Sequence, residues 1–158
     1  MSRSLGAALP EDLRRDLSQS DLIARLGRAL LLLTVDERGH PHPMLCTYVE
    51  ILAVSAEALH LVIGTESGSA RNLRTRGHAT LVIAEPERVA YVKCRAAGSP
   101  LVAGGLARFV LRVEEVLEDS ALAWEGGARI TSGVVYAPAP SLDAPEVRAA
   151  LSLLRETA

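Results

Sequence analysis

Short, largely apolar runs separated by polar turns recur through the first 120 residues of this chain, with no long amphipathic helix between them. The first run covers residues 29–35 and ends in a polar turn that contains Gly39, where a positive φ is expected. Further runs cover residues 44–49, 59–63 and 79–84. Because a parallel sheet needs long crossover helices, this pattern excludes a doubly wound fold and favours a small antiparallel barrel.

Two later stretches alternate between apolar and polar residues, as in a sheet with one buried face. The side chains expected on the buried face are Val92, Cys94, Ala96, Phe109, Leu111 and Val113. Those expected on the wet face are Tyr91, Lys93, Arg95, Arg108, Arg112 and Glu114. We expect a loop over residues 98–105 between these two strands. Together with the four apolar runs, the two alternating stretches make six expected strands.

The remaining patterns are brief. Pro41 and Pro43 fit only an edge or the start of a strand, so pairing of the second strand is expected to begin near Met44. Short helices are expected in five places, namely two between residues 10 and 27, one over 70–76, one near Trp124 and one over 145–154. Residues 133–136 are a candidate for a final strand. The fold class is therefore mainly β with short α-helices, a six-stranded antiparallel barrel.

Composition limits the classes of function. The 158 residues fit one domain, and an apolar content of 49% excludes intrinsic disorder. The net charge of -2 and an aromatic content of 3% argue against a nucleic-acid partner. No aliphatic stretch is long enough to cross a bilayer and no signal pattern begins the chain, so we expect no membrane partner and a cytoplasmic location.

Residue-based catalysis has no visible carrier. Cys46 and Cys94 are too few for a disulfide framework and are expected to be reduced and buried. The four histidines have no third ligand at tight spacing, so no metal site is expected. The sequence contains no GxSxG, HExxH or Walker motif. Any chemistry would rest on a bound cofactor.

The most informative stretch covers residues 64–72, where an expected strand ends in a small polar loop that leads into an expected helix. Backbone N–H groups, hydroxyls and the positive end of the helix dipole would meet there, which suits a dianionic phosphate. Ser67 and Ser69 would donate hydroxyls, and Arg71 would add a charged contact. The same pattern is also typical of a loop that only caps a helix.

The order of these features resembles the pyridoxamine 5'-phosphate oxidase-like family of FMN-binding split β-barrels. The resemblance lies in residues 33–42, in 63–67, and in the Asn72-Leu73 helix followed by the strand at 79–83. It covers about residues 20–120 of a single domain, residues 1–158, with a C-terminal helical extension over about 120–158. It implies a homodimer with FMN at the interface between the subunits.

Site residues follow from the resemblance by position. Those implied to line the ring system or approach it through backbone are Met44, Leu45, Cys46, Thr47, Ile63, Gly64 and Thr65. Those implied to surround the phosphate are Ser67, Ser69, Arg71 and Asn72. Tyr91 and Lys93 are implied at the flavin edge or the neighbouring subunit.

The sequence departs from the family pattern in ways that change the expected reaction. Ser69 stands where members usually carry a basic residue, so Arg71 would replace that contact. Met44 and Val49 stand where true pyridoxamine phosphate oxidases have Arg and Lys, and the C-terminal substrate signature is missing. We therefore do not expect the vitamin B6 reaction.

Three functions fit these observations. The first is an FMN-dependent oxidoreductase that accepts hydride or electrons from a reduced nicotinamide or small donor. The second is a non-catalytic binding protein for a flavin, heme or a deazaflavin (coenzyme F420), in which His40, His42 or His78 would be the heme ligands to test. The third is a barrel without a cofactor that serves as a dimeric interaction module.

Overall fold

The computed structural model describes residues 1–86, 88–119, 124 and 126–157, and within these ranges the chain is mainly β. The strands are β1 (Ser2–Gly6), β2 (Ala29–Val35), β3 (Pro41–Thr47), β4 (Ile51–Ala53), β5 (Ala58–Gly64), β6 (His78–Glu85), β7 (Arg88–Ala103) and β8 (Leu106–Asp119). The helices are α1 (Glu11–Asp16), α2 (Leu22–Arg25), α3 (Gly68–Thr75) and α4 (Pro145–Arg155), with a 3-10 turn η1 (Tyr48–Glu50). The expected helical stretch near Trp124 lies largely outside the described residues.

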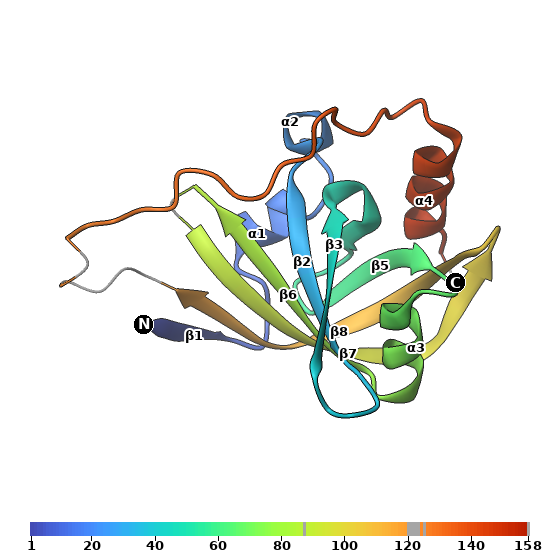
Figure 1. The fold of residues 1–158 in the computed structure, drawn as a ribbon, viewed down its shortest axis with the longest axis horizontal. Coiled ribbons are helices and arrows are strands. Elements are labelled where there is room, and N and C mark those ends of the chain that lie inside the picture. The colour runs from blue at the N-terminus through green and yellow to red at the C-terminus, as the bar shows by residue number, and fades with distance from the viewer. Residues whose placement is uncertain (87, 120–123, 125, 158) are drawn as a thin grey trace.

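The strands form one antiparallel sheet in the order β3-β2-β6-β7-β8-β5-β4, with β1 paired to β8. The sheet curls, so β5 returns toward β2 and β3 (Figure 1). Eight strands are present in the described residues where the sequence predicted six. The two additional strands, β1 and β4, are too short or too polar to show a periodicity in the sequence, and only pairing with β8 and β5 makes them strands.

The inner face of the curled sheet holds the core. Leu32 of β2, Ile51 of β4, Leu61 of β5 and Val92 of β7 are completely or almost completely buried there. Leucines of α1 and α2 and the apolar side of α3 join the same cluster. The structure confirms the two predicted N-terminal helices and the helix predicted over residues 70–76. Burial of this apolar surface is the main stabilising contribution to the fold.

The β2–β3 hairpin was predicted correctly at its turn and incorrectly at the start of its second strand. Gly39 has a φ of +83°, and the backbone N–H of Asp36 donates to the carbonyl of His40 at 2.9 Å. Pairing begins at Pro41, opposite Val35, and not near Met44. Proline is tolerated because β3 lies at the edge of the sheet and has no neighbour on its other side among the described strands.

The β7–β8 pair also differs from the prediction. Strand pairing continues from Leu101 opposite Arg108 to Ala103 opposite Leu106, so the expected loop over residues 98–105 is wrong. A register irregularity between Ala97 and Leu101 absorbs the Gly-Ser-Pro segment, and the chain turns only at residues 104–105. The glycines and the proline mark a bulge in a long hairpin and not its end.

Helix α4 covers the outer face of β5 beside β8 (Figure 1). Arg108 was predicted on the wet face, but it is buried beneath this helix, with 4% of its surface exposed. Its guanidinium donates to the carbonyls of Leu153 and Glu156 at the helix end. The alternation placed Arg108 on the correct face of the strand, and α4 then buried that part of it. Residues 133–136 form only a single bridge, between Arg28 and Val135, in place of the predicted final strand.

Candidate functional site

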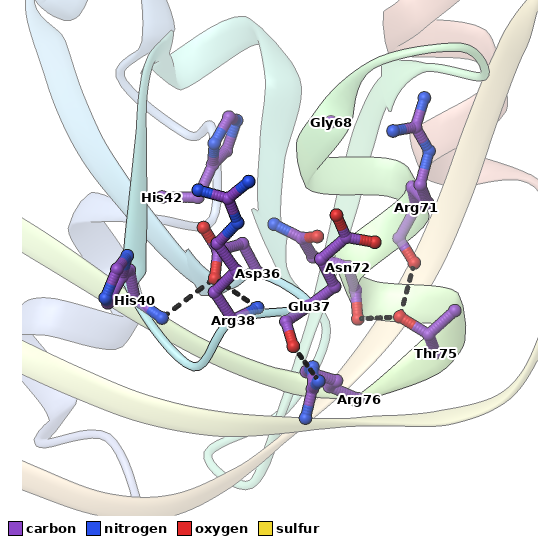
Figure 2. A pocket seen from close by; sticks show the side chains of 10 residues that line it. All are labelled: Asp36, Glu37, Arg38, His40, His42, Gly68, Arg71, Asn72, Thr75 and Arg76. Carbon is purple, nitrogen blue, oxygen red and sulfur yellow. Dashed lines mark hydrogen bonds between the residues drawn. The ribbon is translucent and has the colours of Figure 1, made fainter.

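A pocket of about 590 Å³ lies between the β2–β3 turn and α3 (Figure 2). Its walls come from two segments that are distant in the sequence and adjacent in the fold. The turn contributes Asp36, Glu37, Arg38, His40 and His42. The helix contributes Gly68, Arg71, Asn72, Thr75 and Arg76. The pocket therefore adjoins the loop that the sequence singled out, and it contains Arg71 and Asn72 of the predicted site.

The first turn of α3 is capped, and it also carries polar groups that have no partner. Ser67 is the N-cap, and its hydroxyl accepts a hydrogen bond from the backbone N–H of Ala70 at 3.1 Å. Ser69 is completely buried, yet its hydroxyl has no partner among the described residues, and the same holds for the buried hydroxyl of Thr65. Helix capping explains Ser67 alone. Both hydroxyl oxygens are closed to solvent and neither residue lines the pocket, so the two hydroxyls do not mark a ligand contact.

His42 lies directly against the start of this helix. A Cβ placed on Gly68 would meet Nε2 of His42 at 2.9 Å, closer than side chains normally approach. Glycine at this position therefore allows the imidazole to reach the helix terminus. Figure 2 shows the ring of His42 on the same side of the pocket as the Arg38 guanidinium. The arrangement places a histidine and an arginine beside the first N–H groups of α3, which have no intrahelical partner.

The pocket is rich in cationic groups. The guanidinium groups of Arg38 and Arg71 form no ion pair with any described carboxylate, and Arg76 donates to the carbonyl of Glu37 at 2.7 Å. The carboxylate of Asp36 accepts backbone hydrogen bonds from His40 and Arg38, which lower its pKa. Asp36 is therefore ionised and occupied with the turn. Glu37 also lines the pocket, so three arginines lie there with two acidic side chains.

The predicted residues of β3 divide between two faces. Met44 and Cys46 point toward the core with His42, and burial raises the pKa of the Cys46 thiol so that it stays protonated. Leu45 is on the outer face with 43% of its surface exposed. Thr47 is committed to η1, because its backbone N–H and hydroxyl both donate to Glu50. The four side chains therefore do not line one surface, and the four residues share only the backbone edge of β3.

The end of β5 is sterically open at Gly64. Ile63 is buried, whereas Gly64 is exposed and has no atom within 4 Å of the place where a Cβ would be. The backbone N–H of Thr65 donates to the carbonyl of Gly105 at 2.9 Å, which anchors the loop to the β7–β8 turn. A planar group can therefore approach the backbone at Gly64 without a steric clash.

Tyr91 and Lys93 lie on β7, away from the pocket, on the outer face of the sheet. Tyr91 donates to Asp119 at 3.3 Å, and Lys93 donates to Glu115 at 2.8 Å. The register carries Tyr91 through Val82 and Leu31 to Leu45 at the edge strand. The structure therefore brings Tyr91 and Leu45 onto one face of the sheet without joining them to the phosphate loop.

Four residues of this pocket, Arg38, His40, His42 and Arg76, were not among the predicted FMN-binding residues, although His40 and His42 were named as heme ligands to test. His42 precedes Met44 and Cys46 by two and four positions, and side chains two apart in a strand lie on the same face. A predicted strand that began at Pro41 would therefore have placed His42 on the face of Met44 and Cys46. No local signal indicates Arg38 or Arg76, since the contact between the turn and the helix is a product of the fold.

The part of the chain that the structure describes contains no group of three or more His, Cys, Asp or Glu side chains placed to hold a metal ion. It also contains no helix with the length and apolar character needed to cross a lipid bilayer.

Solved structures share the fold of this chain, whereas comparisons of its sequence find no match. No protein-family model and no curated protein matches the chain. A candidate pyridoxamine 5'-phosphate oxidase from Lactobacillus delbrueckii superposes with a TM-score of 0.55 at 18% identity, over 72% of this chain and 98% of that one. An FMN-binding protein from Syntrophomonas wolfei gives 0.53 at 14%, over 71% and 92%. HupZ from Group A Streptococcus gives 0.54 at 12%, over 81% and 99%. The chain has the antiparallel split-barrel fold of these proteins, as its sequence predicted.

Proposed function

We propose that this split-barrel protein binds flavin mononucleotide and passes hydride or electrons between a reduced nicotinamide or small donor and an acceptor. The observation that carries the proposal is the pocket at the start of α3, where Arg38 and Arg71 form no ion pair with a described carboxylate and His42 lies against Gly68. A dianionic phosphate there would accept hydrogen bonds from the first N–H groups of the helix and from the arginine side chains. The fold likeness to an FMN-binding protein supports the same assignment.

The residues around the loop fit the rest of such a cofactor. Arg71 would provide a charged contact to the phosphate, and His42 would provide a hydrogen bond from the opposite wall of the pocket. The ring system would lie along β3, whose outer edge has backbone groups that no described strand pairs. Gly64 would allow it to approach the end of β5. The flavin supplies the redox chemistry when bound, and the protein supplies binding, orientation and electrostatics.

The outer face of the sheet supports a homodimer. One cross-strand row consists of Leu45, Leu31, Val82 and Tyr91, and the next consists of Pro43, Leu33, Thr80 and Lys93. None of these side chains belongs to either buried cluster of the described residues, although most of them are apolar. A second copy of the chain would bury these rows and would enclose a ring bound along the edge of β3. In this arrangement Leu45, Tyr91 and Lys93 would contribute to the flavin site from the interface between the two subunits.

An absorption spectrum of the freshly purified protein tests the proposal. We expect a flavin doublet, or its appearance after reconstitution with FMN and gel filtration, together with a dimer by light scattering. Failure to retain any FMN after reconstitution would overturn the flavin assignment. A Soret band in its place would favour heme, for which His40 and His42 of the pocket are the ligands to replace.

Arg71→Ala isolates the phosphate contact. If Arg71 holds the phosphate, this variant should weaken FMN binding by about 1.5 to 3 kcal/mol, the usual contribution of a hydrogen bond to a charged group. Arg148→Ala is the matched control, since Arg148 is an exposed arginine on α4. Fluorescence titration of FMN with each variant gives the comparison, and equal affinities would remove Arg71 from the site.

A further inference from the structure

A second pocket, of about 500 Å³, lies between the C-terminal end of α3 and the part of β7 that extends beyond β6. Helix α3 lies beside this end of the β7–β8 hairpin in Figure 1. One wall is the end of the helix and the turn after it, residues 73–77. The other wall is β7, residues 95–96 and 98–100, and Phe109 of β8 also lines the pocket. We call this pocket the β7 groove.

The strand wall of the β7 groove is an open sheet edge. Strand β6 pairs with β7 only as far as Arg95, and the backbone N–H of Ala96 then donates to the carbonyl of Gly77 at 2.7 Å. Beyond Ala96, no described strand pairs with β7 on the side away from β8. An open edge of this kind can pair with an extended segment of another chain. Pro100 has no N–H, so the edge suits a short segment and not a long strand.

The β7 groove is positively charged. Arg74, Arg76 and Arg95 line it, and none of its described lining residues is acidic. Arg95 is paired with Glu114 at 2.7 Å, whereas Arg74 and Arg76 form no ion pair with any described carboxylate. Their guanidinium groups donate to backbone carbonyls, which orient the charge without neutralising it. The protein as a whole has a net charge of -2, so this basic groove is a local feature.

Helix capping does not account for these two arginines. An arginine near the end of a helix often donates to the last carbonyls of that helix. Here Arg74 reaches the carbonyl of Thr65, which precedes α3, and Arg76 reaches the carbonyl of Glu37 in the β2–β3 turn. Because the two carbonyls belong to different segments, the two charges are held at separate points. A ligand that contacts both must carry separate anionic groups along its length.

Apolar surface lies beside these charges. Arg74 lies over the ring of Phe109, with its Cζ 5.9 Å from the ring centroid. Pro100 is half-buried in the strand wall, and the next two residues of the edge, Leu101 and Val102, are exposed. In an extended peptide, alternate side chains point to opposite sides. A segment that alternates between acidic and apolar residues therefore matches both kinds of surface.

An acidic peptide fits the groove better than a nucleic-acid strand. Proteins that bind single strands stack the bases on accessible aromatic rings. Phe109 is the one aromatic residue among the described lining residues, and only 2% of its surface is exposed. The groove therefore offers cationic groups and an open strand edge but no platform for a base.

We propose that the β7 groove binds a short, extended, acidic segment of a partner protein. Its carboxylates contact Arg74 and Arg76, and its main chain lies along the open edge of β7 after Ala96. Main-chain pairing supplies part of the affinity, and the arginines supply the selection for acidic residues. The inference does not depend on the proposed function, because it involves neither the flavin nor its donor.

Fluorescence anisotropy of the full chain tests the selection for acidic residues. The probe is a labelled heptapeptide in which glutamate and valine alternate, and the reference peptide has glutamine in place of each glutamate. An ionic strength of about 0.15 M screens loose attraction between surface charges. The glutamate peptide should then bind at least about 10-fold more tightly than the reference. The double variant Arg74→Gln/Arg76→Gln should remove this preference and Arg148→Gln should retain it, with circular dichroism as the check that each variant is folded.

Two further glutamate peptides test the contact with the strand edge. One is N-methylated at its odd-numbered amides and the other at its even-numbered amides, and only one of these sets faces β7 in an extended segment. One of the two should therefore bind about 10-fold more weakly than the other.

Four outcomes would overturn the inference. They are equal affinity for the glutamate and glutamine peptides, an unchanged preference in the folded double variant, equal affinity for the two methylated peptides, and displacement of the glutamate peptide by an equimolar oligothymidylate of the same net charge. The last outcome would indicate a surface for nucleic acid.

Discussion

Nδ2 of Asn72 donates a hydrogen bond to Oγ1 of Thr34 at 3.0 Å, within the protein interior and across 38 positions of the chain. Thr34 is on the inner face of β2 with 1% of its surface exposed, and Asn72 is in the middle of α3. The bond fixes the helix against the hairpin. It therefore sets the distance between the start of α3 and the turn that carries Arg38, and with it the width of the pocket.

Asn72→Ala should lower the free energy of unfolding by about 1 to 3 kcal/mol, because it leaves the buried Thr34 hydroxyl without its main partner. Urea denaturation measures this loss. Thr75→Ala, an exposed site on the same helix, should change stability by no more than about 0.5 kcal/mol. A double-mutant cycle with Thr34→Val isolates the pair, and a coupling energy near zero would show that the bond contributes nothing.

Gly68→Ala should weaken FMN binding up to about 10-fold while leaving the fold intact. The added Cβ would lie 2.9 Å from Nε2 of His42 and must displace the imidazole. Alanine is otherwise acceptable, since Gly68 opens a helix with no positive φ. Fluorescence titration compares Gly68→Ala in the natural and in the His42→Ala background. The effect should vanish in the second, and equal losses in both would assign it to something other than the imidazole.

Glu50 should make the protein less stable as the pH rises. Burial raises the pKa of its carboxyl above the ordinary value of about 4.5, although hydrogen bonds from Thr47 oppose this. The folded state therefore favours the protonated acid. The corresponding contribution to stability is complete below the pKa of the unfolded chain and is lost as the pH rises through that of the folded protein.

Glu50→Gln removes this titration while keeping an oxygen that accepts from Thr47. Urea midpoints measured from pH 4 to pH 8 should show a difference, variant minus natural protein, that grows in favour of the variant with increasing pH. A difference that stays constant over this range would mean that Glu50 titrates alike in the folded and unfolded chains.

Local sequence patterns predicted an element correctly where the residues of that element determine its structure. The β2–β3 turn follows from Asp36 and Gly39, and α4 follows from its proline start and apolar spacing. Local patterns gave wrong predictions where a second element determines the burial or the pairing of a residue. Arg108 is buried because α4 lies over it, and β4 is a strand because β5 is beside it. The bulge after Ala97 is also invisible locally, since Gly, Ser and Pro are equally typical of a loop.

The candidate site shows the same division. The order of residues along the chain alone determined the antiparallel barrel, the Ser67 cap and the serine-bearing loop before α3, because hydrophobic period and turn chemistry act over a few residues. Only the tertiary structure decided that Arg38, His42 and Arg76 line one pocket with the start of α3. Their approach depends on a hairpin and a helix packed together through Asn72 and Thr34, and no short-range preference encodes a contact between segments so far apart.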